Sequence, residues 1–149
     1  MKILIDADGC PVVKETVDIS KKYNTECIII CDTSHHFEIE GVKTITVSKG
    51  ENSVDFKLVN MVSAGDIVIT QDYALAAMCL ARKATAINQN GLIYNDDNIL
   101  SLLNQRHISQ KIRRSGGRLR GSAKRDVSQN EAFIKTLETI LKQKREKST

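Results

Sequence analysis

Residues 3–11 read Ile-Leu-Ile-Asp-Ala-Asp-Gly-Cys-Pro, three apolar residues followed by two closely spaced aspartates. An apolar run that ends at Asp-x-Asp-Gly is typical of a buried strand leading into a tight loop. Asp6 and Asp8 then lie at the carboxyl edge of a strand, where ligands bind in open α/β sheets. Two close carboxylates favour a hard cation such as Mg²⁺ or Mn²⁺ as counter-ion. The alternative is that Asp6 ends the strand and Asp8 begins a helix.

Apolar periodicity predicts a regular alternation of strands and helices after this opening. Strands are expected at about residues 2–6, 27–32, 42–47, 66–70 and 84–88. Helices are expected at about residues 11–23, 52–63, 72–83 and 96–103, with a further helix near the C-terminus. Such alternation implies crossover connections, so we expect a three-layer α/β/α fold around a mostly parallel sheet.

The chain divides into three parts on this interpretation. Residues 1–104 form the α/β core, residues 105–127 form a basic Gly/Arg-rich loop, and residues 128–149 form a C-terminal helix with a charged tail. The helix is expected to pack on the core through apolar residues at helical spacing, namely Phe133, Leu137, Ile140 and Leu141.

Charge is unevenly distributed along the chain. Residues 1–97 hold nine Lys/Arg and fourteen Asp/Glu, a balance of −5, whereas residues 98–149 hold thirteen and four, a balance of +9. This asymmetry indicates an acidic site on the core beside a basic surface for a polyanion, although solvated charge on a tail gives the same count. No apolar run is long enough to cross a bilayer, and the four scattered cysteines form no disulfide framework, so we expect a cytoplasmic protein.

Two further aspartates are candidates for the acidic site. Asp72 follows the strand expected at 66–70, so it lies at the same sheet edge as Asp6 if the first and fourth strands are neighbours. Asp55 falls in the first turn of a crossover helix, which begins on that side. Taken singly, Asp72 is an N-cap and Asp55 complements a helix dipole. Asp66 lies at the start of this strand and is assigned to a turn at the opposite edge.

The basic stretch carries the candidate phosphate contacts, which are Arg113, Arg114, Arg118, Arg120 and Lys124. The guanidinium group of arginine can donate two parallel hydrogen bonds to phosphate oxygens. Binding of nucleic acid through such contacts weakens strongly as the salt concentration rises. A disordered linker explains the same residues equally well. Aromatic residues make up 4% of the chain and Trp is absent, which argues against a dedicated base-stacking platform. The three histidines, His35, His36 and His107, are expected to be solvated, and contact of one of them with a substrate is the alternative.

The motifs match a known pattern. Asp6-Ala7-Asp8-Gly9-Cys10-Pro11-Val12, Val54-Asp55, residues 65–72, Gly116-Gly117 and residues 128–133 resemble the bacterial YaiI/YqxD family of uncharacterised proteins in order and spacing. That family looks like a branch of the PIN-like nuclease superfamily. The resemblance implies a three-layer α/β/α fold with acidic metal ligands at the carboxyl edge of the sheet.

The resemblance also assigns particular positions. Carried across, Asp6, Asp8, Asp55 and Asp72 match the family's acidic residues. This chain has Asn52 where members often have the first carboxylate of an Asp-x-x-Asp pair, and Gly121-Ser122 where members often have Gly-Pro. The loss of one carboxylate would weaken a second metal site, although an amide oxygen can still be a ligand.

These observations predict a metal-dependent nuclease that acts on nucleic acid, with RNA favoured and Mg²⁺ or Mn²⁺ as cofactor. Asp6, Asp8, Asp55 and Asp72 would bind the metal. A non-catalytic nucleic-acid-binding protein is the first alternative. A haloacid-dehalogenase-like phosphatase, with Asp6 as nucleophile and Asp8 as general acid/base, is the second.

Overall fold

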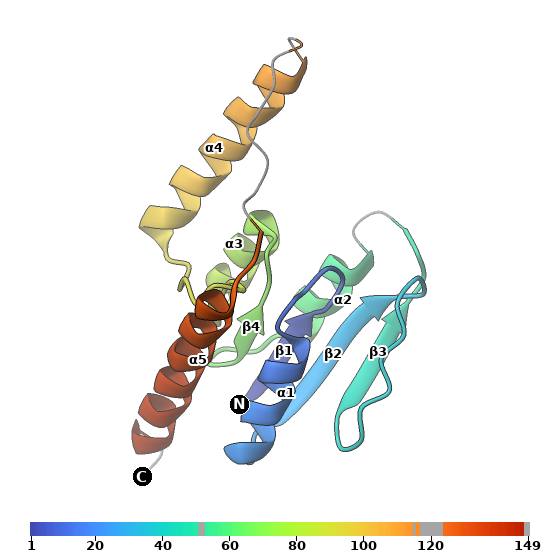
Figure 1. Ribbon diagram of the computed structural model, residues 1–149, viewed down its shortest axis with the longest axis vertical. Helices are drawn as coiled ribbons and strands as arrows, with labels where there is room; N and C mark the ends of the chain where they lie inside the picture. The colour runs from blue at the N-terminus through green and yellow to red at the C-terminus, as the bar shows by residue number, and fades with distance from the viewer. Residues whose placement is uncertain (51–52, 115, 117–123, 148–149) are drawn as a thin grey trace.

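A parallel sheet of five strands forms the centre of the molecule, in the order β3-β2-β1-β4-β5 (Figure 1). The computed structural model describes residues 1–50, 53–114, 116 and 124–147, except for the side chains of residues 106–110 and 112–114. The strands are β1 (Lys2–Asp6), β2 (Glu26–Asp32), β3 (Lys43–Val47), β4 (Ile67–Ile69) and β5 (Thr85–Ile87). All four strand pairs are parallel, so their carboxyl ends meet at one edge.

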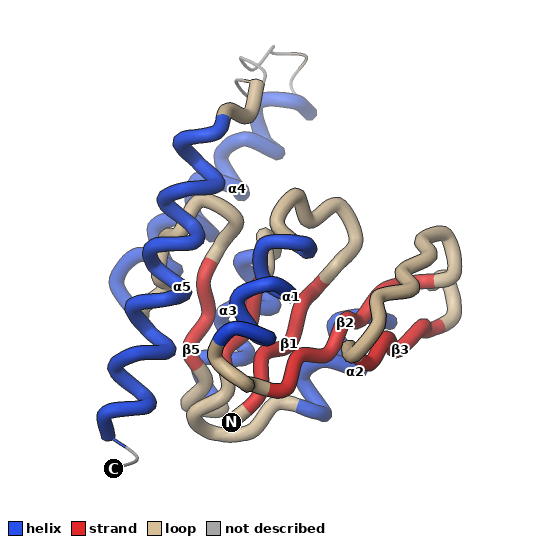
Figure 2. The backbone as a smooth tube through the Cα atoms, turned by 60° about the horizontal axis from the view of Figure 1, so that its bottom comes forward, coloured by secondary structure: helices blue, strands red, loops and turns tan. Residues whose placement is uncertain are grey.

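Helices cover both faces of this sheet. The helices α1 (Val13–Lys22) and α5 (Val127–Lys147) pack on one face. The helices α2 (Ser53–Met61), α3 (Tyr73–Ala81) and α4 (Asp96–Arg114) belong to the other face (Figure 2). The expected three-layer α/β/α fold is therefore confirmed.

Alternation along the buried strands explains why two cores form. In β1, Ile3 and Ile5 face the α1/α5 layer, whereas Leu4 faces the α2/α3 layer, and all three are fully buried. Successive side chains of a strand point to opposite faces, so a continuous apolar run is buried on both sides. Each such side chain contributes about 1.5–3 kcal/mol on burial.

The helix α4 is longer than predicted. Residues 105–114, assigned to the basic loop, continue the helix to Arg114. The apolar pattern fades after Leu103, but residues 104–114 hold no Gly or Pro, so nothing interrupts the backbone hydrogen bonds. Asn95 and Asn98 cap the start reciprocally, each backbone N–H bonding the other's side-chain oxygen at 2.9 and 2.8 Å. Gly116, with φ of +82°, follows the end of the helix.

The C-terminal helix α5 docks on the core as expected. Phe133, Leu137, Ile140 and Leu141 are buried against the sheet. The loop after β5 approaches the helix so closely that a Cβ at Gly91 would lie 2.7 Å from the carbonyl oxygen of Ala132.

One basic residue before α5 is engaged within the fold. Arg125 donates to the side chains of Asn130 and Asn90 at 2.8 and 2.6 Å, and to the carbonyl of Gln89 at 2.6 Å. It therefore joins the start of α5 to the loop after β5.

Asp66 lies at the amino edge of the sheet, as its position before β4 predicts, but it does more than end a turn. It is 2% exposed, and its carboxylate accepts from Lys2 Nζ at 2.7 Å, the Lys2 amide at 3.0 Å and the Ser63 amide at 2.8 Å. Burial works against the charged form, but these donors outweigh it and lower the pKa of Asp66 below its ordinary value. Asp66 thus ties the start of β1 to the start of β4.

No helix in the described part of the chain is both long enough and apolar enough to span a membrane.

Candidate functional site

An acidic cavity of about 540 Å³ opens at the carboxyl edge of the sheet. Five carboxylates line it, those of Asp6, Asp8, Asp32, Asp55 and Asp72. None of the described residues that line it is a lysine or an arginine. Like charges held together in this way repel each other unless a cation or hydrogen-bond donors offset them.

Strand order explains how residues 66 positions apart reach the same cavity. The first strand, β1, pairs in parallel with β4, with Ile5 opposite Ile69. Asp6 ends β1, and Asp72 follows β4 by three residues. The condition on which the predicted convergence depended, that the first and fourth strands be neighbours, is met.

Asp6 is the most perturbed of these carboxylates. Burial is the main cause that raises its pKa from 3.8 to about 6. A hydrogen bond from the hydroxyl of Thr70 at 2.7 Å lowers the pKa, whereas the charges of Asp55, Asp72 and Asp8 raise it further. A carboxyl group with a pKa near neutrality in a cleft is a physical marker of a functional site.

Thr70 contacts two of these aspartates at once, the side chain of Asp6 and the backbone of Asp72. It is 1% exposed; its hydroxyl donates to Asp6 Oδ2 and accepts from the backbone N–H of Asp72 at 3.0 Å. Asp72 in turn caps α3, because its Oδ1 accepts from the amides of Ala74 and Leu75 at 2.9 and 3.3 Å. The capping role and a place in the acidic cavity are therefore compatible.

Asp55 reaches the cavity from the first turn of α2. Its pKa is raised, first by burial and then by the charge of Asp72. Burial alone makes the charged form costly, and the neighbouring carboxylate adds to that cost.

Asp8 is held by a second group of contacts that the sequence prediction missed. His35 Nδ1 lies 2.7 Å from Asp8 Oδ1 and 3.3 Å from Asp32 Oδ1. The backbone N–H of Asp32 donates to Asp8 Oδ2 at 3.2 Å. Within the described residues, the one set of three His, Cys, Asp or Glu side chains with ligand atoms within 4.8 Å of one another is Asp8, Asp32 and His35.

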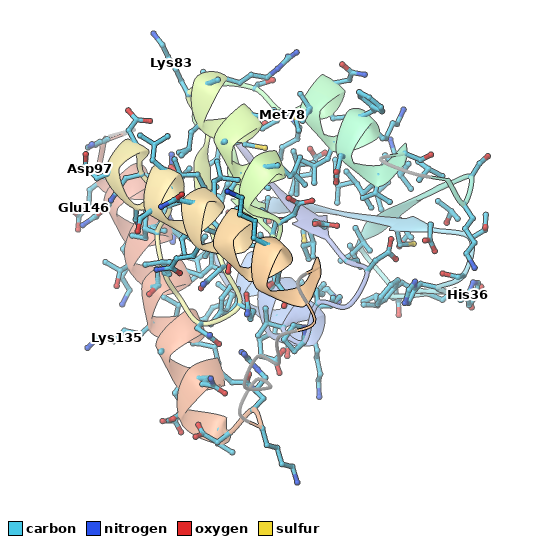
Figure 3. The ribbon with its side chains drawn as sticks, turned by 90° about the horizontal axis from the view of Figure 1, so that it is seen from above. His36, Met78, Lys83, Asp97, Lys135 and Glu146 are labelled. Atoms are coloured by element: carbon cyan, nitrogen blue, oxygen red, sulfur yellow. The ribbon has the colours of Figure 1, made fainter. Side chains whose placement is uncertain are left out.

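The place of Asp32 at this edge of the sheet could have been predicted from the sequence. Asp32 ends β2 just as Asp6 ends β1, so the same edge argument applies to it. His35 carried no such signal, because its contact depends on how the loop after β2 turns back. His36 is solvated as expected, with 81% of its side chain exposed at the rim of the molecule (Figure 3). His35 is exposed too, at 43% of its side chain, but it also contacts Asp8.

The predicted phosphate contacts are only partly placed. Lys124 is exposed. Arg118 and Arg120 lie outside the described residues, as do Asn52, Gly117, Gly121 and Ser122. The backbone of Arg113 and Arg114 belongs to α4, while their side chains, and that of His107, lie outside the description.

The donor set suits a hard divalent cation. Every carboxylate that lines the cavity offers oxygen, and the partly desolvated Asp6 gains most from a nearby positive charge. The cysteines are poor candidates: Cys27, Cys31 and Cys79 are buried and burial raises their pKa. Mg²⁺ or Mn²⁺ therefore fits the residues better than a thiolate-bound metal.

Comparison with known proteins identifies the family. The family model described as "Uncharacterized BCR, YaiI/YqxD family" matches residues 4–143. The chain belongs to the YaiI/YqxD family. It is 49% identical over 144 residues to a UPF0178 protein of Exiguobacterium sibiricum, covering 97% of this chain and 99% of that relative. A UPF0178 protein of Ruminiclostridium cellulolyticum is 51% identical over 142 residues, covering 95% and 93%.

Membership confirms the resemblance seen in the motifs and leaves the activity open, since the family is uncharacterised. No solved structure matches the chain. The residues that line the cavity therefore carry the information on its chemistry.

Proposed function

We propose that this YaiI/YqxD protein is a metal-dependent nuclease, with RNA as the favoured substrate. The observation that carries the proposal is the half-buried carboxylate of Asp6, with a pKa raised to about 6, in a cavity shared with four other aspartates. The preference for RNA follows from the resemblance to PIN-like nucleases.

Asp6, Asp8, Asp55 and Asp72 would hold Mg²⁺ or Mn²⁺. A bound ion of this kind lowers the pKa of a coordinated water and stabilises the leaving oxygen of a phosphodiester. The contribution of the chain is to hold the carboxylates in place. Thr70 orients Asp6 and the Asp72 amide, while the Asp32 amide and His35 orient Asp8.

A hydrogen bond from the segment after β4 also fixes the loop between β1 and α1, which carries Asp8. The side-chain amide of Gln71 donates to the carbonyl of Gly9 at 2.8 Å. Gly9 has φ of +73°, a conformation that favours glycine and turns the chain directly after Asp8. The loop that bears Asp8 is thereby tied to the end of β4, next to Asp72.

Nucleic acid would be held through phosphates by Arg113, Arg114, Arg118, Arg120 and Lys124. The helix α4 supports this part of the proposal, because its second half extends beyond the carboxyl ends of the strands (Figure 1). It carries part of the basic sequence to the side of the molecule on which the acidic cavity opens. Arg125 is excluded from this role because its guanidinium already binds three groups of the fold.

The test is cleavage of a 5′-labelled single-stranded RNA with Mn²⁺, followed on a denaturing gel. We expect Asp6→Asn to reduce the rate at least a hundredfold and a chelator to abolish cleavage. Asp18→Asn is the matched control, because Asp18 is exposed on α1 and the charge change is the same. Identical cleavage by wild type and Asp6→Asn would identify a contaminating nuclease and reject the proposal.

A non-catalytic nucleic-acid-binding protein is the second candidate, favoured by the +9 balance of residues 98–149. It predicts RNA binding that weakens steeply with salt but is unchanged by chelator or by the double substitution Asp6→Asn/Asp72→Asn. A gel-shift titration at two salt concentrations separates this candidate from the nuclease.

The phosphatase interpretation loses support from the geometry. It calls for a Gly-Asp pair after a late strand, and Gly65-Asp66 precedes β4. The Asp66 carboxylate lies at the amino edge, where it binds Lys2. It is therefore at the opposite end of the sheet from Asp6.

A further inference from the structure

Tyr73 gives the acidic cavity an aromatic wall. It begins α3 directly after Asp72 and lines the cavity together with the carboxylates. It is half-buried, and it packs against the core on the α2/α3 side of the sheet as well as lining the cavity. The nuclease chemistry proposed above makes no use of this ring.

A buried partner supports the orientation of the ring. Tyr73 meets Tyr94 edge to face, with ring centroids 6.2 Å apart and an angle of 64° between the planes. Tyr94 is 2% exposed, and its hydroxyl donates to the carbonyl of Thr70 at 3.1 Å. Edge-to-face packing against a ring that is itself hydrogen-bonded restricts the rotamers of Tyr73.

Aromatic wall and carboxylates form one connected unit. Thr70 accepts from Tyr94 through its carbonyl and donates to Asp6 through its hydroxyl. Tyr73 is the residue next to Asp72. A phosphodiester bound at the carboxylates would therefore bring a neighbouring base or sugar within reach of the Tyr73 ring.

The cavity also has room for more than a metal ion. Its volume of about 540 Å³ falls within the usual range for ligand sites, roughly 300–1,000 Å³. Its carboxylates favour cations and repel phosphates, so an attractive contact for the organic part of a substrate has to come from elsewhere. Stacking of a base on an aromatic ring is such a contact, and it tolerates any base because every base has a π face.

We propose that Tyr73 forms a stacking subsite for an unpaired nucleobase, which makes the site selective for single-stranded nucleic acid. This inference rests on the proposed function. Bases within a duplex are already stacked and paired, so presenting one to the ring requires unstacking. The subsite adds a contact that the low aromatic content of the chain had argued against.

The first experiment uses fluorescence, since the chain contains no tryptophan. Tyr73→Trp introduces a single fluorophore at the cavity, and Tyr23→Trp introduces one at a half-buried position beyond the C-terminal end of α1. Each is titrated with a single-stranded ten-nucleotide RNA in Ca²⁺, which is expected to replace Mn²⁺ without supporting turnover. We expect quenching for Tyr73→Trp and not for Tyr23→Trp. Equal responses of the two variants would overturn the proposal.

The second experiment measures affinity and strand preference. Removal of a stacked aromatic residue weakens binding about five- to 150-fold, so we expect a loss in this range for Tyr73→Leu and little change for Tyr73→Phe. Tyr23→Leu is the matched control. Equal affinities of Tyr73→Leu and Tyr73→Phe would overturn the subsite, as would equal cleavage of duplex and single strand by wild type. Absence of cleavage by wild type in Mn²⁺, with RNA still bound, would instead reject the nuclease.

Discussion

Asp6→Asn should make the metal-free protein more stable. In the unfolded chain this carboxyl group titrates near 3.8, but in the folded protein burial raises its pKa to about 6, even though Thr70 donates a hydrogen bond to it. Above pH 6 the fold therefore holds a carboxylate that is more favourable in the unfolded chain. The asparagine removes the charge and retains a side-chain oxygen that can accept from Thr70.

The size of the effect follows from the pKa. A difference of one pKa unit corresponds to about 1.36 kcal/mol, so the charged form of Asp6 costs the fold about 3 kcal/mol above pH 6. Between pH 3.8 and about 6 the folded protein binds more protons than the unfolded chain, so the free energy of unfolding falls as pH rises through this window. We expect Asp6→Asn to gain about 2–3 kcal/mol at pH 8, about half of that at pH 5, and little near pH 4.

Urea unfolding in EDTA at pH 8, 6.5, 5 and 4 measures this difference. Asp18→Asn, the exposed control, should remain within about 0.5 kcal/mol of wild type. A gain for Asp6→Asn that does not change with pH, or no gain at pH 8, would show that the fold does not hold an unfavourable, partly desolvated charge at this position. A residue that destabilises the metal-free fold is expected where stability is sacrificed for function.

Three further predictions concern metal binding and the two ends of the sheet. Millimolar Mn²⁺ should raise the melting temperature of wild type in a thermal-shift assay and have no effect on Asp6→Asn; an equal rise in both would place the ion elsewhere. Asp66→Ala should cost about 3–5 kcal/mol in urea unfolding, because it leaves Lys2 without its buried partner, and a loss below about 1 kcal/mol would contradict that role. Gly91→Ala should cost about 1–3 kcal/mol, because the new methyl group meets the Ala132 carbonyl at 2.7 Å and φ is +86°; an unchanged urea midpoint would show that α5 can shift.

Local sequence patterns were sufficient for most of the fold. The apolar runs of β1, β2 and β4 predicted strands, and in the fold these strands are buried on both faces because successive side chains of a strand point to opposite sides. The positions of Asp6 and Asp72 at strand ends predicted their sheet edge. The apolar periodicity of the sequence did not predict the second half of α4, because this part of the helix has no continuous apolar stripe.

Local sequence patterns did not predict contacts between residues that lie far apart in the chain. Nothing local indicates that β1 lies between β2 and β4, that His35 turns back to Asp8, or that Arg125 binds the fold. The amino-acid order places each aspartate at the end of its own element, because secondary structure follows from neighbours along the chain. Their gathering into one cavity, and the raised pKa of Asp6, arise from strand pairing and burial, which depend on the packing of the whole molecule.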